Sequence, residues 1–289
     1  MIRASPADWD ILRFLDAPVW FGRRHLAPLL ALVVPARIVA VVPSTVGQAL
    51  TWGVGADEAG PRMWLGLALT YGGMVFSMLI LTGMFAALTH AVVHRMHGRT
   101  PRVEDSWRFA LRPAVLGTTV LIGGLTMVGS AMCLLPGLLA AMYLSLALPV
   151  MVQEGRLGGA ALDRSVELAR HGKGGAWFTS TGAFALCLSF SYAMLSYAIT
   201  SLVTLPAAGI GAAVGIRAAA SGAPVQDAMA LLPGSLAVVL NLGSAVLSGF
   251  ADIYVVAAVV LLYQRAVDLL EGVDLCRALE PGAEPGSPA

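Results

Sequence analysis

The chain has 289 residues, of which 57% are hydrophobic and 12% are charged, and its formal net charge is +1. Soluble domains average about 25% charged residues, so this chain has too few charges to cover a wetted surface. A near-zero net charge without a basic block excludes nucleic acid as the partner, and three widely spaced cysteines exclude a disulfide framework. We therefore expect a polytopic membrane protein whose first partner is membrane lipid.

The N-terminal segment, residues 1–25, contains three aspartates and no apolar core of the kind found in signal peptides. We expect it to lie in the cytoplasm and the first membrane span to be retained. Residues 26–275 then form the membrane domain. Residues 276–289 are rich in proline and glycine, which predicts a disordered cytoplasmic tail.

Six apolar stretches are long enough to cross a bilayer, since a helix needs about 20 apolar residues for about 30 Å of hydrocarbon. Backbone polar groups cannot go unpaired in lipid, so each stretch is expected to be a helix and the fold class to be all-α. In chain order they are residues 26–50, 63–92, 114–134, 136–153, 177–205 and 236–264. The apolar residues 228–240 either extend the sixth helix or form a separate re-entrant helix.

Basic residues are unevenly distributed across this six-span arrangement. Most of the 18 lysines and arginines fall in the N-terminal segment or after the second, fourth and sixth spans. The positive-inside rule therefore predicts that both termini are cytoplasmic. The bias toward Ala, Gly and Arg fits a GC-rich bacterial source, which makes the bacterial cytoplasmic (inner) membrane the expected location.

Two of these basic links are alike. The second and fourth spans are each followed by Gly-Arg and a short amphipathic segment, within residues 96–112 and 153–172. The sixth span leads into a third charged segment, QRAVDLLEG. We expect short amphipathic helices on the cytoplasmic surface, and the pattern permits a repeat of three two-span hairpins. The alternative is that any span that exits on the cytoplasmic side attracts arginine.

The closing stretch LLYQRAVDLLEGVDL (261–275) resembles the signature of the glycerophosphoryl diester phosphodiesterase membrane-domain family, L-L-Y-x-D-x-R-x-x-x-E-G-x-D. The direct matches are Leu261, Leu262, Tyr263, Glu271, Gly272 and Asp274. The sequence departs at Arg265, which stands where the family often has Asp. A second similar block, residues 149–178, contains Glu154, Arg164 and Ser165.

The resemblance covers nearly the whole chain in span order and length. It implies the membrane module alone, because the phosphodiesterase chemistry belongs to a soluble domain that some members append, and such a barrel needs about 250 residues. We therefore expect no enzyme activity and no cofactor.

The family-like residues have physical roles at a membrane surface. We expect the Tyr263 hydroxyl to lie among headgroups and Arg265 to reach phosphate or snorkel. Gly272 would end the helix. Glu154 and Arg164 are expected to form an ion pair, and Glu271 and Asp274 could pair with Arg164 or Arg170. A plain solvated helix end is the alternative for the closing stretch.

Two charges lie deep within predicted spans. Arg37 is about 12 residues into the first span and Asp252 about 12 residues from the end of the sixth, so each is roughly 18 Å deep. Because such charges are costly, we expect the two side chains to pair near the midplane. The pair could lock helices together or line a pathway, and independent snorkelling is the third alternative.

No catalytic or metal-binding set stands out in the sequence. His90, His94 and His97 share one helix face, but a zinc site would need a further ligand. Two functions remain: a non-enzymatic module of the bacterial envelope that binds lipid or a partner protein, or a small transporter or channel with the Arg37–Asp252 pair in its path. An intramembrane enzyme is the weakest alternative.

Overall fold

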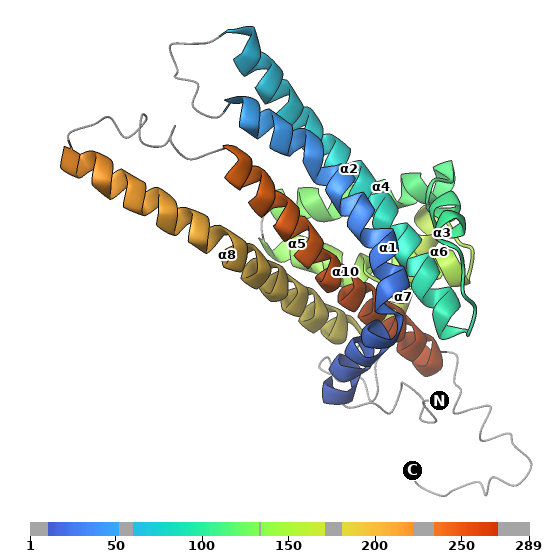
Figure 1. Ribbon diagram of the computed structural model, residues 1–289. Helices are drawn as coiled ribbons and strands as arrows, with labels where there is room; N and C mark the ends of the chain where they lie inside the picture. The colour runs from blue at the N-terminus through green and yellow to red at the C-terminus, as the bar shows by residue number, and fades with distance from the viewer. Residues whose placement is uncertain (1–10, 52–59, 133, 171–180, 222–233, 271–289) are drawn as a thin grey trace, which may run out of the picture. The chain divides into compact units, whose positions relative to one another are not determined.

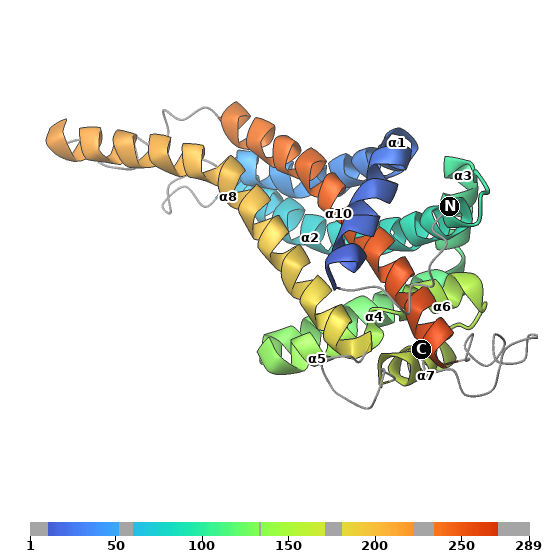
Figure 2. The ribbon, with the colours of Figure 1, turned by 90° about the horizontal axis from the view of Figure 1, so that it is seen from below.

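The described residues of the computed structural model are 11–51, 60–132, 134–170, 181–221 and 234–270, and their only regular secondary structure is helical (Figure 1). The helices, in chain order, are α1 (Ile11–Thr51), α2 (Pro61–Met96), α3 (Val103–Ala110), α4 (Pro113–Met132), α5 (Leu134–Leu144), α6 (Ala147–Gln153), α7 (Gly159–Arg170), α8 (Thr181–Ser221) and α10 (Gly234–Leu270). Figure 2 shows how much longer α8 is than the short helices α5, α6 and α7. The prediction of an all-α chain is confirmed for the described residues.

Four helical stretches are long and apolar enough to cross a membrane. They are Asp16–Thr51, Pro61–Met96, Thr181–Val203 and Val238–Leu270. A fifth crossing results if α3 and the first part of α4, which are bent by 72° relative to each other, count as one span. The described residues thus identify a multi-pass membrane protein with four or five such elements, and the predicted count of six is not confirmed.

The predicted fourth span, residues 136–153, is divided between α5 and α6. The break falls at Ser145 and Leu146. Pro149 explains it, because proline has no N–H to donate to the carbonyl four residues earlier, and its ring would clash there. The helical bonds resume with the N–H of Val150, which donates to the carbonyl of Leu146 over 3.1 Å. At 11 residues, α5 is about 16 Å long, which is too short to cross a bilayer.

The chain divides into two compact units. Unit 1 comprises residues 1–26, 86–191 and 254–289, and unit 2 comprises residues 27–85 and 192–253. The long helices α1, α2, α8 and α10 each contribute to both units, whereas α3 to α7 belong to unit 1. Within α1, the backbone at His25 departs from helical geometry next to the boundary between the two units.

Unit 1 has a core of aliphatic side chains with essentially no solvent exposure, among them Leu88, Val92, Leu168 and Leu262. The short helices α3 and α7 bury one face each. In α7, Leu168 and its neighbours on that face are buried while Glu167 and Arg170 are exposed. α3 and α7 are therefore amphipathic, as the sequence predicts.

Unit 2 is built on close helix contacts at small residues. A Cβ placed on Gly47 of α1 would lie 2.5 Å from the Thr70 nitrogen of α2, and one on Gly73 would lie 2.6 Å from the Ser44 nitrogen. Such small residues permit close backbone approach between membrane helices. The outward side chains are apolar, as with Trp64, which is 66% exposed. A surface of this kind requires lipid to cover it.

Three predictions concern residues near the ends of the described ranges. α8 continues to Ser221, well beyond the predicted end at residue 205. Residues 234–240 belong to α10, while 228–233 lie outside the described residues. The family-motif residues Glu271, Gly272 and Asp274 and the tail 276–289 also lie outside them.

Candidate functional site

Unit 2 contains a polar cluster formed by Arg37 of α1, Asp252 of α10 and Tyr192 of α8. The Arg37 Nε donates to Asp252 Oδ2 over 2.7 Å, and Nη2 donates to Oδ1 over 2.6 Å. The Tyr192 hydroxyl donates to the same Oδ1 over 3.0 Å. The structure thus brings together the two charges that the sequence singled out, and it adds a tyrosine that the sequence analysis missed.

The geometry of this cluster is that of a paired and hydrogen-bonded charge. The Asp252 side chain is 0% exposed and that of Arg37 is 15% exposed. Both carboxylate oxygens accept from the guanidinium in a two-point arrangement, which is the strongest geometry for such a pair. Because three helices of unit 2 meet at one carboxylate, the cluster fixes their rotation and relative height within that unit.

A second polar contact in unit 2 joins α10 to α1. The Asn241 side-chain amide lies 3.4 Å from Thr45 Oγ1 and from Gln48 Oε1. These groups were not singled out from the sequence, because single polar residues in an apolar run give no register between helices. The contact between α1 and α10 in unit 2 therefore has polar interactions at two places along the helices, the Arg37–Asp252 pair and the Asn241 amide.

Unit 1 contains a second cluster, which we call the Glu154 hub. It comprises Glu154, Arg156, Arg164 and Tyr263. Glu154 Oε1 accepts from Arg164 Nε over 3.2 Å and from the Tyr263 hydroxyl over 2.9 Å, and Oε2 lies 3.1 Å from Arg156 Nε. The predicted Glu154–Arg164 contact is therefore present, and the hub joins α7 to the end of α6 and to Tyr263 within α10.

Arg164 also donates from Nη1 to Glu167 Oε2 over 3.0 Å. Burial opposes the charged form of Arg164, but the hydrogen bonds and charges of Glu167 and Glu154 outweigh burial and raise the pKa of Arg164 above its ordinary value. Arg164 therefore remains a cation at ordinary pH.

The buried Ser165 ties α7 to α5, because its hydroxyl donates to the carbonyl of Tyr143 over 2.6 Å. The backbone N–H of Gly158, just before α7, donates to Thr118 Oγ1 of α4 over 2.8 Å. Ser165 is thus a structural contact within unit 1, and α7 is anchored at both its start and its middle.

The interfacial roles expected for Tyr263 and Arg265 are wrong. Tyr263 is 4% exposed and bonded to Glu154, so its hydroxyl does not reach headgroups. Arg265 is also 4% exposed, and its Cζ lies 3.7 Å from the centre of the Phe184 ring. Within the described part of the chain, its Nε and Nη1 are buried without a hydrogen-bond partner. The physical reason is that α10 continues to Leu270 while other elements of unit 1 enclose this turn.

The three histidines of α2 and its exit are held by local contacts. His90 lies 4.8 Å from Phe109, ring centre to ring centre, and its Nδ1 lies 3.3 Å from Ser106 Oγ. In the part of the chain that the structure describes, no three His, Cys, Asp or Glu side chains are placed to hold a metal ion.

Comparison with protein-family models, with curated proteins and with solved structures finds no match to this chain. Chemically, the Arg37–Asp252–Tyr192 cluster stabilises one packing of three helices. The Glu154 hub instead positions a charged surface helix.

Proposed function

We propose that the protein is a non-enzymatic membrane module that binds membrane lipid through its basic surface. The Glu154 hub carries the proposal, because it holds α7, with the exposed Arg170 in its last turn, beside the end of α6 and against α10 in unit 1. The exposed arginines of the link after α2, such as Arg99 and Arg102, add to this charge. Basic residues next to membrane helices attract anionic lipid at about 1 kcal/mol each.

The finer placement is part of the same proposal. The chain crosses the bacterial cytoplasmic membrane six times, with α5 and α6 together as the fourth span, and both termini lie in the cytoplasm. The basic links after the second, fourth and sixth spans support this orientation. Reporter fusions to both termini test it, because a terminus in the periplasm would activate an alkaline phosphatase fusion and contradict the topology.

The resemblance to the glycerophosphoryl diester phosphodiesterase membrane-domain family belongs here as well. We propose membership on the closing stretch 261–275 and the block 149–178. Glu154, Arg164, Ser165 and Tyr263 from these two stretches contact one another or hold α7 in unit 1, which supports treating the two motifs as one structural device.

The second candidate function is a small transporter or channel that uses the Arg37–Asp252 pair. The observation in its favour is a charged pair within apolar helices, where ionisable residues are commonly functional. The three hydrogen bonds to Asp252 favour a helix-locking role instead, because they occupy three of the about four acceptor positions of the carboxylate.

Native mass spectrometry of the full-length protein in mild detergent tests the main proposal. We expect an anionic lipid to remain bound in defined stoichiometry. A partner protein bound in defined stoichiometry, with no lipid, would contradict lipid binding and favour a role in protein assembly. Ion or solute flux in liposomes that is abolished by replacing Arg37 and Asp252 together would favour the transporter.

A further inference from the structure

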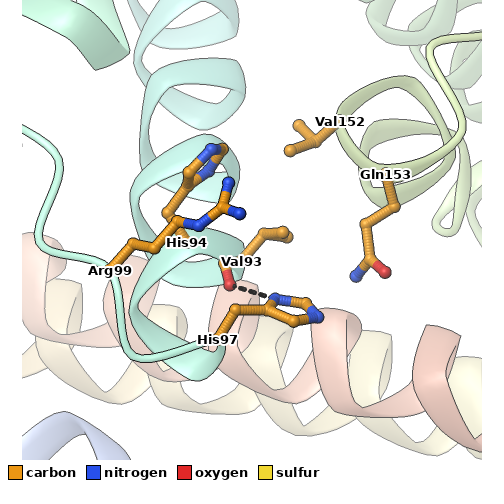
Figure 3. A pocket seen from close by; sticks show the side chains of 6 residues that line it. All are labelled: Val93, His94, His97, Arg99, Val152 and Gln153. Carbon is orange, nitrogen blue, oxygen red and sulfur yellow. Dashed lines mark hydrogen bonds between the residues drawn. The ribbon is translucent and has the colours of Figure 1, made fainter.

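Unit 1 contains a cavity of about 390 Å³ where the end of α2 faces the end of α6 (Figure 3). It is lined by Val93, His94, His97, Arg99, Val152 and Gln153. Four of these side chains are polar and none is acidic. Arg99 therefore gives the cavity a formal positive charge with no carboxylate in the lining to neutralise it.

The backbone turn after α2 explains why these side chains converge. Gly98 has φ of +75°, which favours glycine. Its N–H donates to the Arg95 carbonyl over 3.1 Å, and the N–H of Arg99 donates to the His94 carbonyl over 2.9 Å. These two bonds form a Schellman motif, which brings the residue after the glycine over the last turn of the helix. Figure 3 shows the resulting position of the Arg99 guanidinium beside the His94 ring.

Both imidazole rings are fixed in one orientation. The Nδ1 of His94 lies 2.9 Å from the His90 carbonyl, and that of His97 lies 2.8 Å from the Val93 carbonyl. A carbonyl can only accept, so each Nδ1 carries the proton. Each Nε2 is then an acceptor when the ring is neutral and a donor when it is protonated.

Gln153 completes the set from the opposite helix. Figure 3 places its amide across the cavity from the His97 ring. Its Nε2 is buried and has no hydrogen-bond partner among the residues that the structure describes. A buried donor without a partner costs free energy, so this nitrogen is available to donate to an oxygen of a molecule that enters the cavity.

We propose that this cavity binds a phosphate monoester or inorganic phosphate group, an inference that rests on the proposed function and names its ligand class. Arg99 and Gln153 donate to phosphate oxygens. A monoester has a second pKa near 6, so below that pH it is mainly a monoanion, whose P–OH can donate to a neutral Nε2. Phosphate diesters and sulfate lack that donor. The partial negative charge of the two helix ends opposes any anion, and the Arg99 guanidinium offsets it.

Calorimetric titration of the full-length protein in detergent tests this inference with two probes, inorganic phosphate and dioctanoyl phosphatidic acid. Binding of inorganic phosphate identifies a free anion as ligand. Binding of phosphatidic acid alone identifies a lipid headgroup. Either result supports the site if sulfate and dioctanoyl phosphatidylglycerol bind at least tenfold more weakly. Binding of neither probe, or equal binding of all four, overturns it.

Variants locate the site. Arg99→Gln removes an exposed guanidinium and is expected to weaken binding about tenfold or more. The matched control is Arg62→Gln, an exposed arginine in the first turn of α2 and outside the cavity lining, which should leave affinity unchanged. Equal effects of the two substitutions would overturn the proposal, as would Ni²⁺ binding that depends on His94 and His97 and excludes phosphate.

The two proposals fail differently. Anionic lipid that co-purifies equally with the wild-type protein and with Arg99→Gln would leave the lipid-binding function intact and overturn this site. Inorganic phosphate bound through Arg99, in a protein that retains no lipid, would support the site and overturn the lipid-binding function.

Discussion

Replacing Asp252 by alanine is the sharpest test of the polar cluster in unit 2. The substitution leaves the Arg37 guanidinium with two unpaired donors at 15% exposure and deprives the Tyr192 hydroxyl of its acceptor. Removal of one partner of a buried ion pair costs about 3–5 kcal/mol. At about 2–4 °C per kcal/mol, the unfolding midpoint should fall by roughly 6–20 °C. Thermal unfolding in detergent, followed by intrinsic fluorescence, measures the shift.

The double variant Arg37→Met with Asp252→Leu separates a helix-locking pair from any other role. Both charges are removed, so no unpaired ion remains, and we expect stability within about 1 kcal/mol of the wild type. A double variant as unstable as Asp252→Ala would refute this reasoning, because the loss could then not arise from the uncompensated guanidinium. A single variant with no loss of stability would also refute it.

Three further predictions use the same unfolding assay. Tyr263→Phe removes one of two bonds to Glu154 Oε1 and should cost about 1–2 kcal/mol, and an unchanged midpoint would contradict the observed contact. Arg265→Met should leave stability unchanged or raise it, because it removes a buried cation with unpaired donors. The substitution also loses a cation–π contact worth about 0.5–2 kcal/mol. A clear drop in the unfolding midpoint would show that the charge is compensated. Gly47→Ala should destabilise by about 1–3 kcal/mol, because its Cβ would lie 2.5 Å from Thr70. The control is Gly72→Ala, where the added methyl meets nothing within 4 Å. Equal stability of the two variants would refute the close helix contact.

The long helices could be predicted because a helix that crosses lipid needs only one feature, an apolar run of sufficient length. Apolar runs of the required length identify most of α1, α2, α8 and α10 without any knowledge of their packing. Pro149 was a signal for the break between α5 and α6, but apolar composition alone outweighed it.

The candidate sites, like the helices, could be predicted from the sequence only in part. Arg37 and Asp252 could be paired from the sequence because each charge in an apolar run needs a partner, and both lie at similar depth. Tyr192 could not, because a hydroxyl can satisfy itself in several ways. Tyr263 and Arg265 were misplaced because a helix end was assumed to mark the membrane surface. Their burial depends on how the short helices pack in unit 1, which hydropathy does not encode.

The separation of Arg37 from Asp252 along the chain has a consequence for biosynthesis. The two residues are 215 positions apart. At about 5–20 residues per second, the ribosome needs roughly 10–40 s to make Asp252 after Arg37. During this interval the first helix, if already inserted, contains a cation whose permanent counter-ion does not yet exist. Either its entry into the bilayer is delayed until the last helix emerges, or lipid phosphate and the insertion machinery shield the charge in the meantime.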